Sequence, residues 1–326
     1  MSSDDDGDSD CYTPRLYRYH QDRNLPMAVA MRAMGNIPAM NNKLRHPLCL
    51  LLSLTVCIAP VSAQTGKQPL NDSCWELSFE DSFDELSLWK EESSEGLWRT
   101  RYIWPRDVII NEEQQFYIDP QVHGVSPFTV VDGVLSITAT PTPAALQDKV
   151  SGQPYISGVL TTEKSFNQKY GRFEVSAQPP KGQGLWSAFW LLPSFNQWPE
   201  GVAVLPEIDV MEHLGHQPAT YHTTLHTNQT GPLTSHPYHH SQGADLSDDF
   251  HLYSVVWTPE SVSWFLDGQW KASHPTPEDF TRPVHFLLNL AVGGSWPGSP
   301  DATTEFPAKF RIDFVRAWND NGACAD

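Results

Sequence analysis

Residues 205–215, LPEIDVMEHLG, constrain the fold and function of this chain more than any other stretch. Three carboxylates, Glu207, Asp209 and Glu212, lie within six residues of otherwise mostly apolar sequence. Ionised carboxylates are rarely buried without a partner, because removing their charge from water is costly. The apolar residues between them are typical of a strand. The segment therefore predicts a strand with one packed face and one acidic face.

The spacing of the acids predicts an irregular strand. Residues two apart share a face, so Glu207 and Asp209 lie together, whereas Glu212 is at an odd offset and would point the other way. One extra residue at Val210 or Met211, a β-bulge, would return Glu212 to the acidic face. Bulges occur next to active sites, where they re-aim a side chain. We therefore expect a bulge and a row of three acids.

A row of like charges has a chemical consequence, because at least one pKa in it must rise. Retaining glycosidases use two carboxyl groups with separated pKa values, about 5–5.5 Å apart: one attacks the sugar carbon and the other protonates the leaving oxygen. Glu207 and Glu212, two ladder steps apart on one face, fit that spacing. The segment alone fits equally well a solvated acidic edge strand or a calcium-binding loop.

Further sequence blocks surround this segment in a characteristic order. They are FEDSFDELSLWK (79–90), NEEQQFY (111–117), YGRFEVSAQPPKGQGLWSAFWLLP (170–193), TTLHT (223–227), HLYSVVWTPESVSWFLDG (251–268), LNLAVGGSWPGSPDATTEFP (288–307) and FRIDFVRAW (310–318). Together they cover nearly everything after residue 74. In this order they resemble glycoside hydrolase family 16, and within it the laminarinase-like endo-β-1,3-glucanases. The E-x-D-x-x-E pattern is the bulged form of the family signature.

The resemblance implies a retaining endo-glycosidase that hydrolyses β-1,3-glucan by double displacement. It makes Glu207 the nucleophile that forms the glycosyl-enzyme. Glu212 is then the acid that protonates the departing oxygen and, in the second step, the base that activates water. Asp209, between them, hydrogen-bonds the nucleophile and influences proton sharing. No cofactor is required for this chemistry.

Tryptophans are the candidate sugar platforms, because sugar rings present flat C–H faces to an indole. Trp186 and Trp190 are four residues apart and share a face of a predicted strand. The chain has 12 tryptophans, so many of them must be core residues. The resemblance implies that Trp186 and Trp190 line the cleft beside the catalytic strand. It places the loop of Trp296 over the glycone side.

Two polar residues are further candidates for sugar binding. His226 lies one predicted strand after the acids, and the resemblance implies that its ring reaches the acidic row. Asn111 matches a sugar-contacting asparagine of the family, although Glu112 is an alternative aligned position. The chain departs from the pattern at Val159, where many laminarinase-like members have a sugar-contacting arginine.

Four other histidines, His216, His236, His239 and His240, surround a Pro/Ser-rich stretch. Their spacing is irregular for a zinc site, so we expect a solvated loop there.

A structural calcium is also implied by the resemblance, with Glu80, Gly133 and Asp313 as candidate ligands. The sequence alone would not reveal such a site, because oxygen ligands can come from backbone anywhere. Asp313 is equally compatible with an ordinary polar position on a strand.

The N-terminal part divides into two segments. Residues 1–39 lack apolar periodicity, and we expect a non-native or disordered extension. Residues 40–63 combine basic residues, an apolar run over 48–61 and a small-residue end at Ala63, which predicts a secretory signal peptide.

This arrangement leaves two hypotheses for the start of the chain. Either translation begins at Met40, or the apolar run is a type II membrane anchor with a short cytoplasmic tail. The first predicts a secreted, extracellular catalytic domain over 64–326, without stable membrane insertion after cleavage. The cysteines left are Cys74 and Cys324, which predict one disulfide between the first and last strands; two free thiols are the alternative.

The strand signals after residue 74 are short and frequent, and long helical periodicity is absent. They predict an all-β, two-sheet sandwich, which the resemblance sharpens to a concanavalin-like β-jelly roll. Asp-Gly within residues 266–269 predicts a hairpin turn. The net charge of −18 argues against nucleic acid and favours a neutral polysaccharide partner. We expect a monomer.

Three alternatives stay open. One is a non-catalytic β-glucan recognition protein on the same fold, although such relatives lack the Glu207/Glu212 pair. Another keeps the chemistry and changes the substrate to mixed-linkage glucan or an algal galactan. The last is transglycosylation, which passes through the same covalent intermediate.

Overall fold

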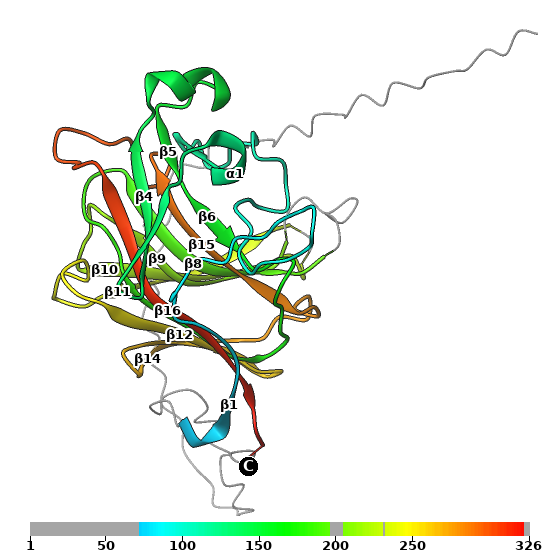
Figure 1. Cartoon of the computed structure of the whole chain (residues 1–326). Helices are drawn as coiled ribbons and strands as arrows, with labels where there is room; N and C mark the ends of the chain where they lie inside the picture. Colours follow the sequence, from blue (N-terminus) through cyan, green and yellow to red (C-terminus); the bar gives the residue numbers. More distant parts are fainter. Residues whose placement is uncertain (1–71, 196–204, 231, 323–326) are drawn as a thin grey trace, which may run out of the picture. The chain divides into compact units, whose positions relative to one another are not determined.

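Two β-sheets form the part of the chain that the computed structural model describes, residues 72–195, 205–230 and 232–322 (Figure 1). The chain divides into two units, Met1–Pro60 and Val61–Asp326, and the described residues all belong to the second. The predicted extension over 1–39, the predicted signal peptide over 40–63 and Cys324 lie outside them. None of the helices in the described ranges is long and apolar enough to cross a membrane.

The larger sheet has ten strands, in the order β14-β13-β12-β7-β16-β4-β5-β2, with β1 paired to β16 and β3 to β4. Its strands are β1 (Trp75–Asp81), β2 (Gln115–Tyr117), β3 (Phe128–Val131), β4 (Val134–Pro141), β5 (Tyr155–Ser157), β7 (Gly171–Gln178), β12 (His251–Trp257), β13 (Ser261–Leu266), β14 (Gln269–Pro275) and β16 (Ala308–Asp320). All of its pairings are antiparallel except that of β2 with β5.

The smaller sheet has six antiparallel strands, in the order β11-β10-β9-β8-β15-β6. Its strands are β6 (Val159–Thr161), β8 (Leu185–Pro193), β9 (Glu207–Leu214), β10 (Thr220–Thr227), β11 (Thr234–Ser241) and β15 (Val284–Val292). The described helices are short: α1 (Pro120–His123) and two 3₁₀ turns, Asp72–Cys74 and Ala144–Lys149.

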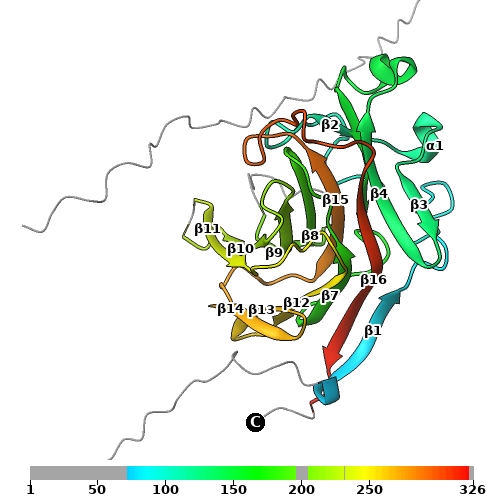
Figure 2. The same ribbon diagram turned by 90° about the vertical axis from the view of Figure 1, so that its left-hand side faces the viewer.

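The hydrophobic core lies between the two sheets, which pack face to face (Figure 2). The core takes alternate residues of each strand, for example Phe189 from β8 and Ile208 from β9, with Trp264 from β13 opposite them. The residues between them therefore point to the other face of the six-stranded sheet. The predicted all-β, two-sheet jelly-roll sandwich is confirmed, and this second face is where the acids of β9 lie.

The predicted hairpin turn is confirmed, because Asp267 and Gly268, between β13 and β14, both have positive φ (50° and 73°). The predicted histidine-rich loop is wrong in part. His236, His239 and His240 belong to β11, which pairs only with β10 among the described strands and is an edge strand. An edge tolerates Pro237, since its missing N–H need not face a neighbour.

The first and last strands are adjacent, as the predicted disulfide requires. Trp75 of β1 pairs with Asp320 of β16, and the amide of Asn321 donates to the carbonyl of Cys74 at 3.0 Å. The Cys74–Cys324 bond itself stays a prediction.

Candidate active site

The predicted bulge in β9 is confirmed. On the β8 side, Phe189 lies opposite Met211, and the next residue, Trp190, lies opposite Asp209. Val210 therefore has no partner on β8 and is the extra residue. Val210 and Met211 both point into the hydrophobic core, so the alternation resumes one residue out of phase.

The register with β10 places the three acids on one face. The pairs are Glu207 with His226, Asp209 with Thr224 and Glu212 with His222. The three β10 partners are two residues apart and share a face, so the acids opposite them share it as well.

The carbonyl of Asp209, next to the bulge, has a partner from the other sheet. The buried indole N–H of Trp264 in β13 donates to this oxygen at 2.9 Å. A bulge locally disrupts the hydrogen-bond ladder, and buried carbonyls need a partner. Trp264 thus ties the irregular backbone under the acids to the core.

Glu207 and Asp209 form a tightly coupled pair. Burial and the charge of its neighbour Asp209 raise the pKa of Glu207 well above its usual value. Burial and the charge of Glu212 raise the pKa of Asp209 to about 6. The two carboxyl groups cannot both ionise freely, so they share protons over a range of pH.

His226 partly compensates the charge of this pair. Its Nε2 lies 3.1 Å from Oδ2 of Asp209 and 3.7 Å from Oε1 of Glu207. Burial lowers the pKa of His226, but the contact with Asp209 and the two negative charges outweigh it, and the pKa rises to about 9. His226 is therefore a cation at neutral pH, which favours the ionised form of the pair.

Glu212 is poised to be protonated at neutral pH. Burial and the charge of Glu207 raise its pKa to about 8. The hydroxyl of Thr224 donates to its Oε2 at 3.3 Å. The nearby indole N–H of Trp186 also lowers the pKa of Glu212, although it forms no hydrogen bond of regular geometry within the described part of the chain. A carboxylic acid and a carboxylate thus stand on one face of one strand.

Aromatic side chains gather at the Glu212 end of the row. Trp186 and Trp296 meet edge to face with ring centroids 5.2 Å apart, and Trp296 also contacts the ring of His222 at 4.9 Å. Trp296 is 40% exposed, which leaves it free to meet a ligand. The structure thus brings two of the predicted sugar-binding tryptophans together beside Glu212.

A second aromatic group lies at the Asp209 end. Trp190 lies edge to face against Tyr102 at 5.6 Å, and Trp104 stacks on Tyr102 at 4.4 Å. Val159, where the resemblance led us to expect arginine, is fully buried in the same apolar cluster. Tyr102 was missed because a single tyrosine on a predicted loop carries no periodic signal.

The most important residue that the sequence reasoning missed is Glu113, in the block NEEQQFY. Its buried carboxylate accepts hydrogen bonds from the side chains of Asn111 (3.1 Å), Gln115 (2.5 Å) and Tyr117 (3.4 Å). Burial raises its pKa to about 7, against these three bonds, which lower it. Asn111, predicted to contact sugar, is exposed and bonds Glu113. The sequence did contain a signal for this residue, since two adjacent acids, Glu112 and Glu113, precede a short aromatic strand.

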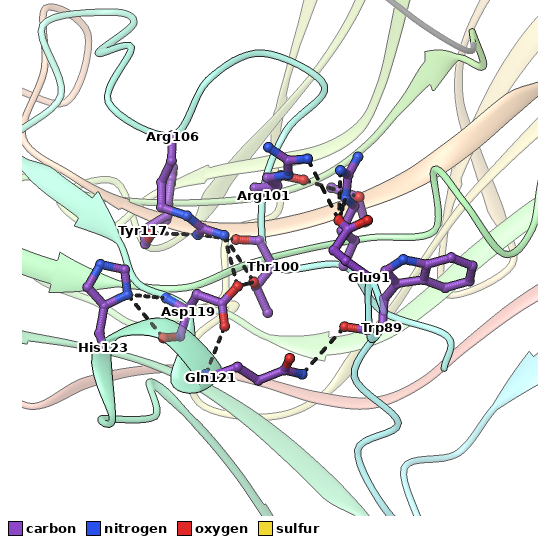
Figure 3. Close-up of polar contacts among 11 residues, drawn as sticks. Trp89, Glu91, Thr100, Arg101, Arg106, Tyr117, Asp119, Gln121 and His123 are labelled. Atoms are coloured by element: carbon purple, nitrogen blue, oxygen red, sulfur yellow. Dashed lines mark hydrogen bonds and ion pairs between the residues drawn. The ribbon is translucent and has the colours of Figure 1, made fainter. Parts of the chain in front are cut away.

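A polar cluster fixes the backbone that carries these residues (Figure 3). The guanidinium of Arg106 donates to the backbone carbonyls of Thr100 and Tyr117, at 2.5 and 2.8 Å. It also pairs with Asp119 at 3.1 Å. Arg106 thereby joins the segment before Trp104 to strand β2.

Two of the candidate calcium ligands, Glu80 and Asp313, have protein partners. Oε1 of Glu80 already accepts two bonds from the Arg316 guanidinium, at 2.8 and 2.7 Å. The Asp313 carboxylate accepts a bond from Ser176 at 3.4 Å. The guanidinium of Arg316 would compete with calcium for Glu80, and the calcium site stays a prediction.

One cluster of possible metal ligands occurs in the described part of the chain, and it belongs to the acidic row. Single ligand atoms of Glu207, Asp209 and His226 lie within 4.8 Å of one another. The histidines of β11 form no such group there.

Comparison with known proteins decides the family. A model described as "Glycosyl hydrolases family 16" matches residues 123–316. This chain belongs to glycosyl hydrolases family 16. The match contains β8, β9 and β10, and thus the whole acidic row.

Relatives in family 16 include the endo-1,3-1,4-beta-glycanase ExsH of Rhizobium meliloti (strain 1021), 38% identical over 79% of this chain and 55% of the relative. A beta-glucanase of Rhodothermus marinus is 32% identical over 87% of this chain and 99% of its own length. The chain thus spans about half the length of the Rhizobium relative and nearly all of the Rhodothermus one.

Among solved family 16 structures, the endo-beta-1,3-glucanase of Pyrococcus furiosus is 32% identical. The superposition has a TM-score of 0.63 and covers 75% of this chain and 94% of that one. The two chains thus share the jelly-roll architecture.

Proposed function

We propose that this chain is a secreted, retaining endo-glycosidase that hydrolyses β-1,3-glucan. The observation that carries the proposal is the bulge at Val210, which turns Glu207, Asp209 and Glu212 to one face of β9. Family membership supports a glycoside hydrolase, and the pKa values of the row support two carboxyl groups with different tasks.

In the first step, the ionised carboxylate of Glu207 attacks the anomeric carbon of the sugar. The bond from that carbon to the bridging oxygen breaks, and Glu212 donates its proton to the departing oxygen. Asp209 holds the proton that the pair retains, and the imidazolium of His226 stabilises the remaining negative charge. The product is a glycosyl-enzyme on Glu207.

In the second step, Glu212, now ionised, removes a proton from water. The water oxygen attacks the anomeric carbon and displaces Glu207, which restores the starting protonation states. Two inversions leave the configuration of the sugar unchanged. No cofactor takes part in this mechanism.

The proposed substrate class is a neutral β-glucan. The aromatic groups on the two sides of the row, Trp186 with Trp296 and Trp190 with Tyr102, suit sugar rings. The names of the relatives favour β-1,3- or mixed 1,3-1,4-linked glucan. Because the Rhizobium relative is described as cleaving both linkages, mixed-linkage glucan is the second candidate.

Several features of the whole protein belong to the same proposal. Secretion rests on the signal sequence over 40–63. The Cys74–Cys324 disulfide, supported by the pairing of β1 with β16, suits an extracellular protein. The protein is a monomer in this proposal. All three acids come from one strand, so no second subunit is needed to complete the acidic row.

Product analysis tests the proposal. The purified protein is incubated with laminarin, lichenan, curdlan and agarose, with Glu207→Gln as the blank. We expect a ladder of laminarin oligosaccharides from the intact protein alone. Release from lichenan in addition would identify mixed-linkage activity. Binding without release from any glucan would contradict hydrolysis and identify a recognition protein, and cleavage of agarose alone would contradict the substrate class.

A further inference from the structure

A chain of hydrogen bonds runs from Glu113 to Trp190. The hydroxyl of Tyr117 donates to Glu113 at 3.4 Å, the Asn289 amide donates to the Tyr117 oxygen at 3.1 Å, and the Trp190 indole N–H donates to Oδ1 of Asn289 at 2.7 Å. All four side chains are more than 90% buried. In this series of hydrogen bonds each side chain donates to the next, and Glu113 is the final acceptor.

A second arm runs from Glu113 to the loop of Trp296. Nδ2 of Asn111 donates to Oε1 of Glu113 at 3.1 Å, and the carbonyl of Asn111 accepts from the amide of Ser295 at 2.9 Å. Ser295 directly precedes Trp296. Asn111 and Glu112 both have left-handed backbones (φ 55° and 58°), a conformation that costs energy outside glycine and is common at functional sites.

The chemistry of these partners selects a carboxylate. Asn111, Gln115 and Tyr117 all donate to Glu113. A carboxylate accepts all three bonds, because its two oxygens carry acceptor sites only. A glutamine in its place would turn two N–H donors toward groups that already donate.

We propose that Glu113 is a positioning residue for sugar binding, which holds the indole of Trp190 through Tyr117 and Asn289 and the Trp296 loop through Asn111. The inference rests on the proposed function, since it takes Trp296 as a sugar platform and Trp190, which is 7% exposed, as part of the wall of the sugar site. Glu113 does not touch the reacting atoms. Its loss therefore weakens binding of the sugar and leaves the chemical step largely intact.

Binding and kinetics of matched variants test this role. Glu113→Gln breaks both arms, whereas Tyr117→Phe keeps the carboxylate and breaks only the arm to Trp190. For each we expect the Kd of a β-1,3-linked glucose oligosaccharide, measured by calorimetry, and the KM for laminarin to rise about ten-fold, as for one charge-assisted hydrogen bond. We expect kcat to change less than about two-fold. The double variant should match Glu113→Gln alone, since Glu113→Gln already breaks the arm that Tyr117→Phe breaks.

Two controls lie on β7 and β12 of the ten-stranded sheet, which are separated from β2 by several strands. Glu174→Gln disturbs a buried carboxylate that pairs with Arg172 and accepts from Ser254. Tyr253→Phe removes a buried hydroxyl that has no hydrogen-bond partner among the described residues. Neither should change Kd, even where Glu174→Gln lowers Tm.

The outcomes separate this proposal from the proposed function. An unchanged Kd in folded Glu113→Gln, or in Tyr117→Phe if the first does not fold, would overturn the positioning role. So would a loss confined to kcat. A wild-type protein that binds the oligosaccharide without cleaving any glucan would refute hydrolysis alone, and the Kd ratios would still decide the role of Glu113. Absence of binding by the wild type would overturn both.

Discussion

Glu207 and Glu212 share one face of β9 although they are five positions apart, an odd offset that turns two residues of a regular strand to opposite faces. Val210, unopposed on β8, supplies the extra residue that makes this possible. The consequence is that one strand carries both a group whose pKa is raised to about 8 and a carboxylate pair that shares its protons.

Rescue of activity by azide distinguishes the nucleophile, Glu207, from the acid, Glu212. In Glu207→Ala, azide replaces the missing nucleophile on a β-glycoside with an activated aryl leaving group, and one inversion gives the α-glycosyl azide. In Glu212→Ala, azide attacks the glycosyl-enzyme instead of water, and two inversions give the β-glycosyl azide. Without azide, we expect each variant to lose roughly 10²–10⁴-fold in rate or more. NMR of the products distinguishes the two anomers, and the opposite pattern would reverse the assignment.

The pH dependence of kcat/KM should be bell-shaped. Glu212 must be protonated, so activity falls as pH rises through about 8. One member of the Glu207–Asp209 pair must be ionised, so activity also falls at acid pH, where the pair takes up its second proton. With a dinitrophenyl leaving group, which needs no proton, the alkaline decline of the first step should weaken. A profile that stays flat above pH 8 would contradict the role of Glu212 as acid.

His226→Gln should move the acid limb of this profile to higher pH. The imidazolium of His226 lowers the pKa of both Glu207 and Asp209, so its removal raises them, by about 1 unit or more. The alkaline limb should stay in place. His216→Gln, an exposed ring on the turn after β9, is the control and should move neither limb. Identical profiles for His226→Gln and wild type would exclude an electrostatic role.

Trp264→Phe should destabilise the protein more than Trp257→Phe. Both tryptophans are fully buried. Trp264 donates to the Asp209 carbonyl, whereas no residue in the described ranges accepts a hydrogen bond from the indole N–H of Trp257. Leaving the carbonyl unsatisfied costs about 1–3 kcal/mol beyond the change in ring size. Thermal unfolding of the two variants measures the difference. Because the bulge carries the acids, Trp264→Phe should also lower kcat; equal losses of stability would show that the bulge needs no such support.

Trp296→Ala should raise KM for laminarin without lowering Tm. Its ring is 40% exposed and contacts Trp186 and His222 only edge to face, so little packing is lost. Aromatic contacts of this kind contribute about 0.5–1.5 kcal/mol, which corresponds to a rise in KM of about two- to twelve-fold. Trp296→Phe should recover part of the affinity. An unchanged KM would remove Trp296 from the substrate-binding residues.

Much of the fold could be predicted from the sequence, because its strands alternate with a period of two. The same period places Asp209 and Glu212 on opposite faces of a regular strand, and only a bulge brings both to one face. β11 was missed because Pro237 and its histidines resemble a loop, and only its place at the sheet edge makes a strand possible there.

The sequence by itself determined the all-β class, the row of acids and the need for an irregular strand, because each of these depends on residues close together in the chain. Only the tertiary structure decided which residues serve the row. Glu113 reaches Trp190 through Asn289, and Trp264 reaches Asp209 from the other sheet. The register of antiparallel strands and the packing of two sheets bring these distant residues into contact, and no local pattern in the sequence encodes such a contact.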